Sequence, residues 1–258
     1  MTLFGYNLSF LFFSIMVSFR LAAFLLSSPI GSYVSFPSVT IVFSVTVGFL
    51  LAPVIPYHLP PSFGTSGLLF FYAVFTEVLV GVMMGFALQV LFVLASVAGD
   101  FAGLQIGFSM ASLFDPSLGQ VPLLAFFFRV LLLMTFFAMN IHHDVLMALC
   151  RSYETIPVGL PFFSVAEFVP PLVRFFNSIF LLGLRLGLPV VSVILLFNLM
   201  VGIITMTAPQ MNFYFNISFI VNMGIGLLIV ASGIITLLRF FETGTESLYQ
   251  LLKVFTTP

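Results

Sequence analysis

The sequence predicts an all-α membrane protein with about six long apolar helices, some broken or hairpin-like. Apolar residues make up 61% of the 258 residues and charged residues only 6%, against about 25% charged residues in an average soluble domain. The apolar residues also run in long stretches separated by Pro, Gly, Ser and Asn clusters. One soluble core could not bury so much apolar surface, so the surplus must face lipid or partner subunits. We expect a single domain over residues 1–258, with a short C-terminal tail at about 242–258.

Six apolar stretches are candidate helices, at about 3–26, 39–55, 68–98, 123–149, 172–205 and 217–241. A helix needs about 20 apolar residues to cross the hydrocarbon core. The third and fifth stretches exceed this by a third or more, so their helices tilt, leave the membrane or are broken. In the fifth stretch, Gly183, Gly187 and Pro189 predict two half-helices, because proline removes a backbone donor and clashes with the preceding turn.

Charged residues inside the apolar stretches predict polar contacts at depth. Arg129 and Arg185 lie well inside, and Glu77 is the carboxylate that lies well inside a stretch, whereas Asp144 is near the end of the fourth. An arginine at the bilayer centre costs about 2.5–3.5 kcal/mol on insertion scales. Either these groups line a wet cavity or the helices pack against other protein, and we favour the second interpretation.

Glycines repeat at intervals of four residues in three places: 81/85, 99/103/107 and 183/187. This spacing lets helix backbones approach closely. We therefore expect dense helix packing, with candidate packing and assembly residues Glu77, Gly81, Gly85, Arg129, Arg185 and Pro189.

No catalytic, metal or cofactor site is predicted. The cluster His142-His143-Asp144 is the nearest approach to one, but paired metal-binding histidines usually lie four residues apart on one helix face. A polar helix end is the simpler interpretation. The single cysteine, Cys150, allows no internal disulfide. Seven Lys and Arg against eight Asp and Glu exclude nucleic-acid binding through a basic patch.

Residues 103–122 form an unusual connection between the third and fourth stretches. The segment is too apolar for a solvated loop and too rich in glycine for a stable helix, and it contains Asp115-Pro116. Irregular backbone at membrane depth persists only where it is buried in protein or lines a cavity. Two interpretations remain: a re-entrant or pore-plugging segment, and an amphipathic connector on the membrane surface.

Several ordered blocks together resemble one family. They are 77–86, 98–116, Asn140-Ile141-His142-His143 with Ser152-Tyr153, and 207–212, within a similarity running from Phe19-Arg20 to about Gly226. In this order and spacing the blocks are similar to the R-type export-gate subunits of flagellar and virulence type III secretion systems. Departures include Ile141, where the family commonly has glycine, and Asn216-Ile217-Ser218 after the last block.

The resemblance implies a non-enzymatic subunit of a helical, cone-shaped export gate in the bacterial inner membrane, at the flagellar basal body. One copy would join P-type and Q-type gate subunits, the B-type and A-type flagellar export membrane proteins and membrane lipid, without nucleic acid or cofactor. Unfolded flagellar proteins would be the substrates. The family's plug corresponds to 103–122, where the gating candidates are Gly103, Gln105, Gly107, Phe108, Met110, Leu113, Phe114, Asp115 and Pro116. Pro209 and Gln210 join the assembly candidates.

Two alternatives stay open. A virulence secretion subunit is the nearer one, although the blocks at 105–116 and 208–212 favour the flagellar branch. A multi-pass secondary transporter belongs to another class and is supported by a broken helix and ionisable residues at depth. A membrane enzyme is weaker still, because no candidate reacting group has an activating neighbour.

Overall fold

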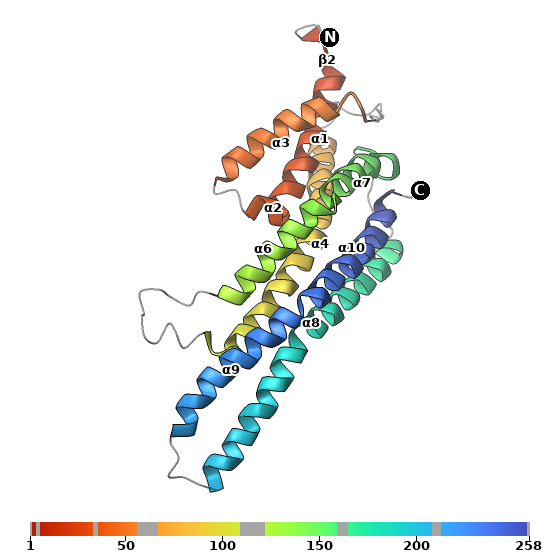
Figure 1. Ribbon diagram of the computed structural model, residues 1–258. Helices are drawn as coiled ribbons and strands as arrows, with labels where there is room; N and C mark the ends of the chain where they lie inside the picture. The colour runs from red at the N-terminus through yellow and green to blue at the C-terminus, as the bar shows by residue number, and fades with distance from the viewer. Residues whose placement is uncertain are drawn as a thin grey trace. The chain divides into compact units, whose positions relative to one another are not determined.

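The computed structural model describes residues 2–3, 6–32, 36–55, 67–108, 122–158, 165–207 and 213–256. Helices fill nearly all of these ranges (Figure 1), which confirms the predicted all-α class. The helices are α1 (Leu8–Ser27), α2 (Pro29–Ser32), α3 (Pro37–Leu51), α4 (Gly67–Ile106), α6 (Leu123–Ala138), α7 (Ile141–Thr155), α8 (Val165–Thr207), α9 (Phe213–Ser232) and α10 (Ile234–Thr256). Residues 242–256, predicted as a tail, belong to α10.

The first helix begins later than predicted. Residues Thr2–Leu3 (β1) and Tyr6–Asn7 (β2) pair as two short antiparallel strands, with Thr2 opposite Asn7 and Leu3 opposite Tyr6. The prediction of a helix from residue 3 is therefore wrong for Leu3, Tyr6 and Asn7. Asn7 precedes α1 directly, and asparagine favours the position before a helix over the helix interior.

Within the described residues, three helical segments are long and apolar enough to cross a membrane: Ser9–Ser27, Gly67–Ile106 and Pro170–Thr207. The count rises to five if two bent pairs, α6 with α7 and α9 with α10, each form one span. Helix α3 is apolar but shorter. The protein is thus a helical membrane protein with broken as well as continuous segments.

The break predicted at residues 183–189 is absent, because α8 continues through Gly183 and Pro189 as one helix of 43 residues. Both Arg185 and Pro189 are exposed. The proline leaves the carbonyl of Arg185, four residues earlier, without its helical donor. Membrane helices tolerate such prolines when neighbouring groups can satisfy the freed backbone group.

The actual breaks lie elsewhere. Asn140 adopts a left-handed conformation, with φ 57°, between α6 and α7. Gly233 separates α9 from α10, and the two helices bend by 49°. Asparagine adopts the left-handed conformation more readily than most residues, and glycine, which has no side chain, weakens a helix where it occurs.

The chain forms two compact units from interleaved segments. Unit 1 comprises residues 1–91, 140–175 and 247–258, and unit 2 comprises 92–139 and 176–246. Helices α4, α8 and α10 continue from one unit into the other, so neither unit is a separate stretch of chain. One domain over 1–258 stays a prediction.

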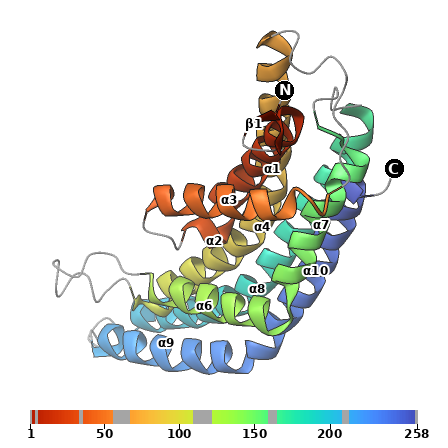
Figure 2. The same ribbon diagram turned by 90° about the horizontal axis from the view of Figure 1, so that it is seen from above.

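In unit 1, α1 packs against α3, which lies across it (Figure 2). Small residues face each other here: a Cβ on Gly48 would overlap the side chain of Ser18, and Ser14, Thr40 and Ser44 are also buried.

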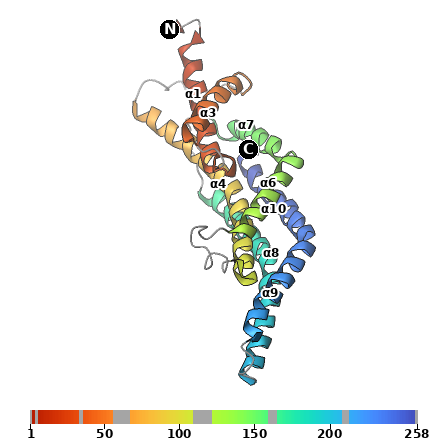
Figure 3. The same cartoon turned by 60° about the vertical axis from the view of Figure 1, so that its left-hand side comes forward.

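In unit 2, α8 and α9 lie side by side (Figure 3), and the Asn222 amide donates to the Asn198 side-chain oxygen at 2.8 Å.

Candidate functional site

A buried ion pair joins α1 to α4 in unit 1. Arg20 is fully buried and Glu77 is 1% exposed. The Arg20 Nε donates to Glu77 Oε2 at 2.7 Å and the Nη2 donates to Glu77 Oε1 at 3.1 Å. This two-point contact matches the planar guanidinium to the carboxylate, which makes it stronger and more directional than a single hydrogen bond.

Helix α7 completes the cluster. Arg20 Nη1 donates to Ser152 Oγ at 2.8 Å, and Nη2 also donates to the Ile156 carbonyl at 3.1 Å. The Arg20 guanidinium lies 3.7 Å from the centroid of the Tyr153 ring. A cation over an aromatic face is further stabilised by the ring's quadrupole. We call Arg20, Glu77, Ser152, Tyr153 and Ile156 the buried polar cluster, because they tie three helices of unit 1 together.

The cluster exists because neither charge is stable alone in an apolar interior. An isolated buried ion loses its hydration, and only paired, hydrogen-bonded ions offset this loss. Each partner therefore requires the other, and α1, α4 and α7 are held in the one register that brings them together.

Gly81 and Gly85 of α4 face α1. A Cβ on Gly81 would overlap the carbonyl oxygen of Arg20, and one on Gly85 would overlap the side chain of Ser27. The absent side chains let the two backbones approach closely, as their spacing predicts. The partner helix belongs to the same chain, and a role in assembly with other subunits stays a prediction.

In unit 2, the end of α4 packs on the start of α6. A Cβ on Gly99 would lie 2.7 Å from Ala125 Cα, and one on Gly103 would lie 3.6 Å from Leu124 Cβ. Arg129 of α6 is exposed, and its Nε donates to Ser96 Oγ at 3.2 Å. Among the residues that the structure describes, this hydroxyl is the partner of Arg129, and no carboxylate there forms an ion pair with it.

The structure describes only the beginning of the predicted plug. Gly103 and Gln105 belong to α4, so the prediction of an irregular segment is wrong for 103–106. Gly107 has φ 97° and donates its N–H to the Gly103 carbonyl, which is a common way for glycine to end a helix. Phe108 follows, half-buried. Met110, Leu113, Phe114, Asp115 and Pro116 lie outside the described residues.

The remaining predicted residues are not brought together. Arg185 and Pro189 are exposed on α8, and Pro209 and Gln210 lie outside the described residues. His142 and His143 lie in the first turn of α7, with their rings 5.8 Å apart. Across the described parts of the chain, no three His, Cys, Asp or Glu side chains gather in a way that could hold a metal ion.

Sequence reasoning missed the partner of Glu77. Arg20, Ser152 and Tyr153 appear in the sequence analysis only as parts of the family resemblance. The signal was available, since Arg20 lies within the first apolar stretch and needs a counter-ion as much as Arg129 does. Sequence spacing alone could not choose among the arginines.

Comparison with known proteins identifies the family. The sequence profile of the family described as Bacterial export proteins, family 1, matches residues 11–248. The chain belongs to this family. It is 29% identical to the "Flagellar biosynthetic protein FliR" of Escherichia coli K12, over 90% of this chain and 88% of the relative. The proteins of that name from Buchnera aphidicola subsp. Schizaphis graminum and Bacillus subtilis 168 are 30% and 29% identical, over 91% and 78% of this chain and 92% and 78% of each relative.

The family match includes the whole buried polar cluster and all the predicted packing and plug residues. It leaves out residues 1–10, which contain β1 and β2, and the last turns of α10. The helices that carry the buried polar cluster thus lie within the region that this export protein shares with its relatives.

We expect Glu77→Gln to destabilise the protein severely, because it leaves the Arg20 cation buried without a counter-ion. Breaking one side of a buried pair costs about 3–5 kcal/mol. The double variant Arg20→Met with Glu77→Leu removes both charges and should recover most of this loss. Glu154→Gln, an exposed change on α7, is the control. The measurement is the unfolding midpoint in mild detergent, and equal midpoints for Glu77→Gln and Glu154→Gln would contradict the prediction.

We expect Gly81→Leu to express but to fail to join its complex, because the side chain forces α1 away from α4. Gly67→Leu on the same helix should be harmless, since no atom lies within 4 Å of a Cβ there. Co-purification with partner subunits is the measurement. Normal recovery of the Gly81→Leu complex would show that the close approach is dispensable.

Proposed function

We propose that this chain is a core subunit of the flagellar type III protein export gate in the bacterial inner membrane. The observation that carries the proposal is the family match over residues 11–248, with flagellar relatives similar over nearly their full length. In this role the chain forms and closes part of the pore through which unfolded flagellar proteins leave the cell. It does so by packing and movement, without bond-breaking chemistry.

The apolar surface that the chain leaves exposed supports the proposal of partner subunits of the P and Q types. Only 17% of the apolar window in α8 is buried. Exposed Leu196, Leu199 and Ile203 follow one another along this helix. Patches of this kind mark contacts with protein or lipid. On α6, the exposed charge of Arg129 favours protein over lipid as the neighbour, because an arginine among apolar side chains needs a polar partner.

A plug at 103–122 is supported by the way its ends are held. Gly99 and Gly103 bring the end of α4 against Leu124 and Ala125 at the start of α6. Both ends of the connection are thus fixed on one pair of packed helices, and Gly107 ends α4 where the segment begins. A short connection on fixed ends is suited to stay in one place within a pore, and its phenylalanines and methionine exclude water.

The alternatives lose support. All of the relatives named above are called flagellar, which favours that branch over virulence secretion. The transporter alternative was supported by a broken fifth helix and by ionisable residues at depth, and the first of these supports is absent because α8 is continuous. The B-type and A-type export proteins belong to the proposal through the family resemblance.

We expect the native protein to be recovered as a single copy in a large hetero-oligomer with smaller apolar subunits. The exposed apolar helix faces and the exposed charge of Arg129 require contacts with other subunits. Native mass measurement of the detergent-extracted complex tests this directly. Recovery of a well-folded monomer or small homo-oligomer would contradict the proposed function.

We expect deletion of residues 108–114 to increase the leakage of ions or small solutes through assembled complexes severalfold, while export itself can persist. A second variant replaces Phe108, Met110, Leu113 and Phe114 by serine and keeps the length, which separates apolar bulk from loop length. Conductance across reconstituted membranes is the measurement, with assembly verified by mass. Unchanged leakage in both variants would place the closure in the partner subunits.

A further inference from the structure

Ile106 is the side chain that anchors the end of α4. In the last turn of this helix, Gly103 has no side chain, Leu104 is 59% exposed and Gln105 is half-buried, whereas Ile106 is 1% exposed. Helix ends open easily unless buried contacts hold them. The position of Gly107, where the chain leaves α4 with φ 97°, therefore depends on what Ile106 contacts.

Ile106 lies against Gly226 of α9, which passes beside the end of α4 in unit 2 (Figure 3). A Cβ on Gly226 would overlap the Ile106 Cγ1 atom and would lie 2.8 Å from its Cδ1 atom. Branching at Cβ restricts the rotation of an isoleucine side chain in a helix. Because Ile106 is also fully buried, it could not turn away from a larger residue at position 226 without moving the end of α4.

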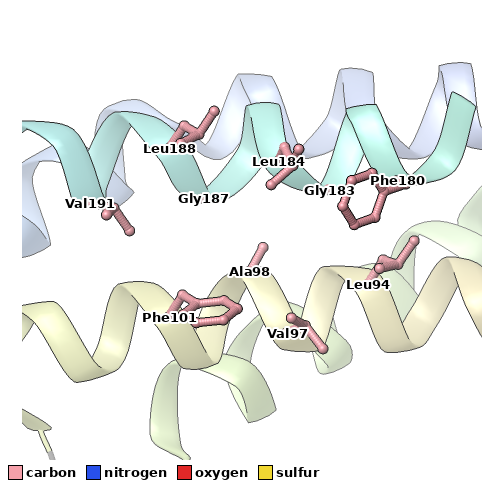
Figure 4. Close-up of a pocket in the computed structure, with 10 residues that line it drawn as sticks. All are labelled: Leu94, Val97, Ala98, Phe101, Phe180, Gly183, Leu184, Gly187, Leu188 and Val191. Carbon is pink, nitrogen blue, oxygen red and sulfur yellow. The ribbon is translucent and has the colours of Figure 1, made fainter. Parts of the chain in front are cut away.

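Helix α8 also packs on α4, but farther from its end. Gly183 of α8 faces Leu94 of α4, and Gly187 faces Ala98 (Figure 4). A Cβ on these glycines would lie 3.3 Å and 3.6 Å from the nearest atoms of α4, and an apolar groove of about 440 Å³ remains beside the contact. Both contacts lie two turns or more before Ile106. Helix α9 thus makes the closer contact, and it does so at the last residue of α4.

Helix α9 is itself held in place one turn away from Gly226. The Asn222 amide donates to the Asn198 side-chain oxygen of α8 at 2.8 Å. Residues four apart lie on the same face of a helix, so Asn222 and Gly226 both belong to the inward face of α9. The hydrogen bond to α8 makes this face a fixed support for Ile106.

We propose that Gly226 is a positioning residue for the plug. By receiving Ile106, it fixes the end of α4 and the direction in which the chain leaves the helix at Gly107, which keeps the plug in its closed position. This inference rests on the proposed function, in which α4 and α6 hold the two ends of the plug. It adds α9 as a third helix that determines where the plug begins.

The test compares Gly226→Ala with Gly224→Ala, two residues away on the same helix, where no atom lies within 4 Å of a Cβ. Gly226→Ala pushes Ile106 and the end of α4 away from α9, and it should increase the leakage of ions through assembled complexes severalfold. Gly224→Ala should leave the leakage unchanged. The measurement is conductance across reconstituted membranes, with assembly verified by native mass. Equal leakage of the two variants would overturn the proposal.

A double variant separates positioning from general damage to the packing. Ile106→Ala removes the Cγ1 and Cδ1 atoms, and in combination with Gly226→Ala it would leave the two Cβ atoms 3.3 Å apart. The double variant should leak less than either single variant, because the overlap is gone and the contact is kept. Independent effects of the two substitutions would add, so leakage equal to the sum of the two increases would contradict the proposal.

If Gly226→Ala does not assemble, Ile106→Ala decides the question. This substitution leaves the last turn of α4 without its buried anchor and should increase leakage in assembled complexes. Leu104→Ala, an exposed change in the same turn, should not. Normal leakage of the Ile106→Ala complexes would overturn the proposal.

The deletion of residues 108–114 distinguishes this inference from the proposed function. If the deletion leaks and Gly226→Ala does not, the plug closes the pore and only the positioning role of Gly226 is wrong. If the deletion does not leak, the proposed plug is wrong and this inference fails with it. If both leak, adding Gly226→Ala to the deletion should cause no further leakage, because the element that Gly226 positions has been removed. A further increase would contradict the proposal.

Discussion

The pairing of Arg20 with Glu77 is the constraint on which unit 1 depends. Both side chains are buried, and the guanidinium on α1 reaches α4 through the Glu77 carboxylate and α7 through the Ser152 hydroxyl and the Ile156 carbonyl at its end. A slip of one turn, about 5.4 Å, would separate the two ions by more than a hydrogen-bond length. Hydrophobic packing alone tolerates such slips, because one apolar side chain replaces another. The ion pair supplies the register, and Gly81 and Gly85 provide the close approach that lets the charges meet without water.

The contact between α1 and α3 buries several small polar residues, while large apolar residues are exposed on the outer face of α3. Between α1 and α3, the buried residues include Ser14, Ser18, Thr40 and Ser44. Their hydroxyls donate mainly to the preceding turn of their own helix, as Ser18 does to the Ser14 carbonyl. The outer face of α3 carries Val42, Phe43 and Leu50, which are 66%, 57% and 69% exposed. Water would destabilise this arrangement, so an apolar environment is required by the fold as much as by the composition.

Sequence patterns predicted where the helices lie better than where they break. All six apolar stretches correspond to helices or helix pairs, because length and hydropathy are properties of the chain itself. The prediction of a break at Pro189 is wrong, since the effect of a proline depends on whether the carbonyl four residues earlier can find another partner. The breaks at Asn140 and Gly233 are single residues of weak propensity, and packing decides whether such residues interrupt a helix. Glu77 was recognised as needing a partner, but Arg20 is 57 residues away, and nothing in the spacing selects it over the other arginines.

The two units differ in the partners of their charged side chains, and this difference separates their roles in the protein. Unit 1 pairs Arg20 with Glu77 inside its own core of α1, α4 and α7. Unit 2 leaves Arg129 with a serine hydroxyl, and Arg185 exposed beside an apolar groove. Asn222 of α9 donates a hydrogen bond to Asn198 of α8, and these two long helices expose most of their described apolar side chains. A surface of this kind becomes stable only when lipid and neighbouring helices cover it. The fold therefore combines an ion pair that is satisfied within the chain with an apolar face whose structure is completed by its surroundings, as a gate subunit requires.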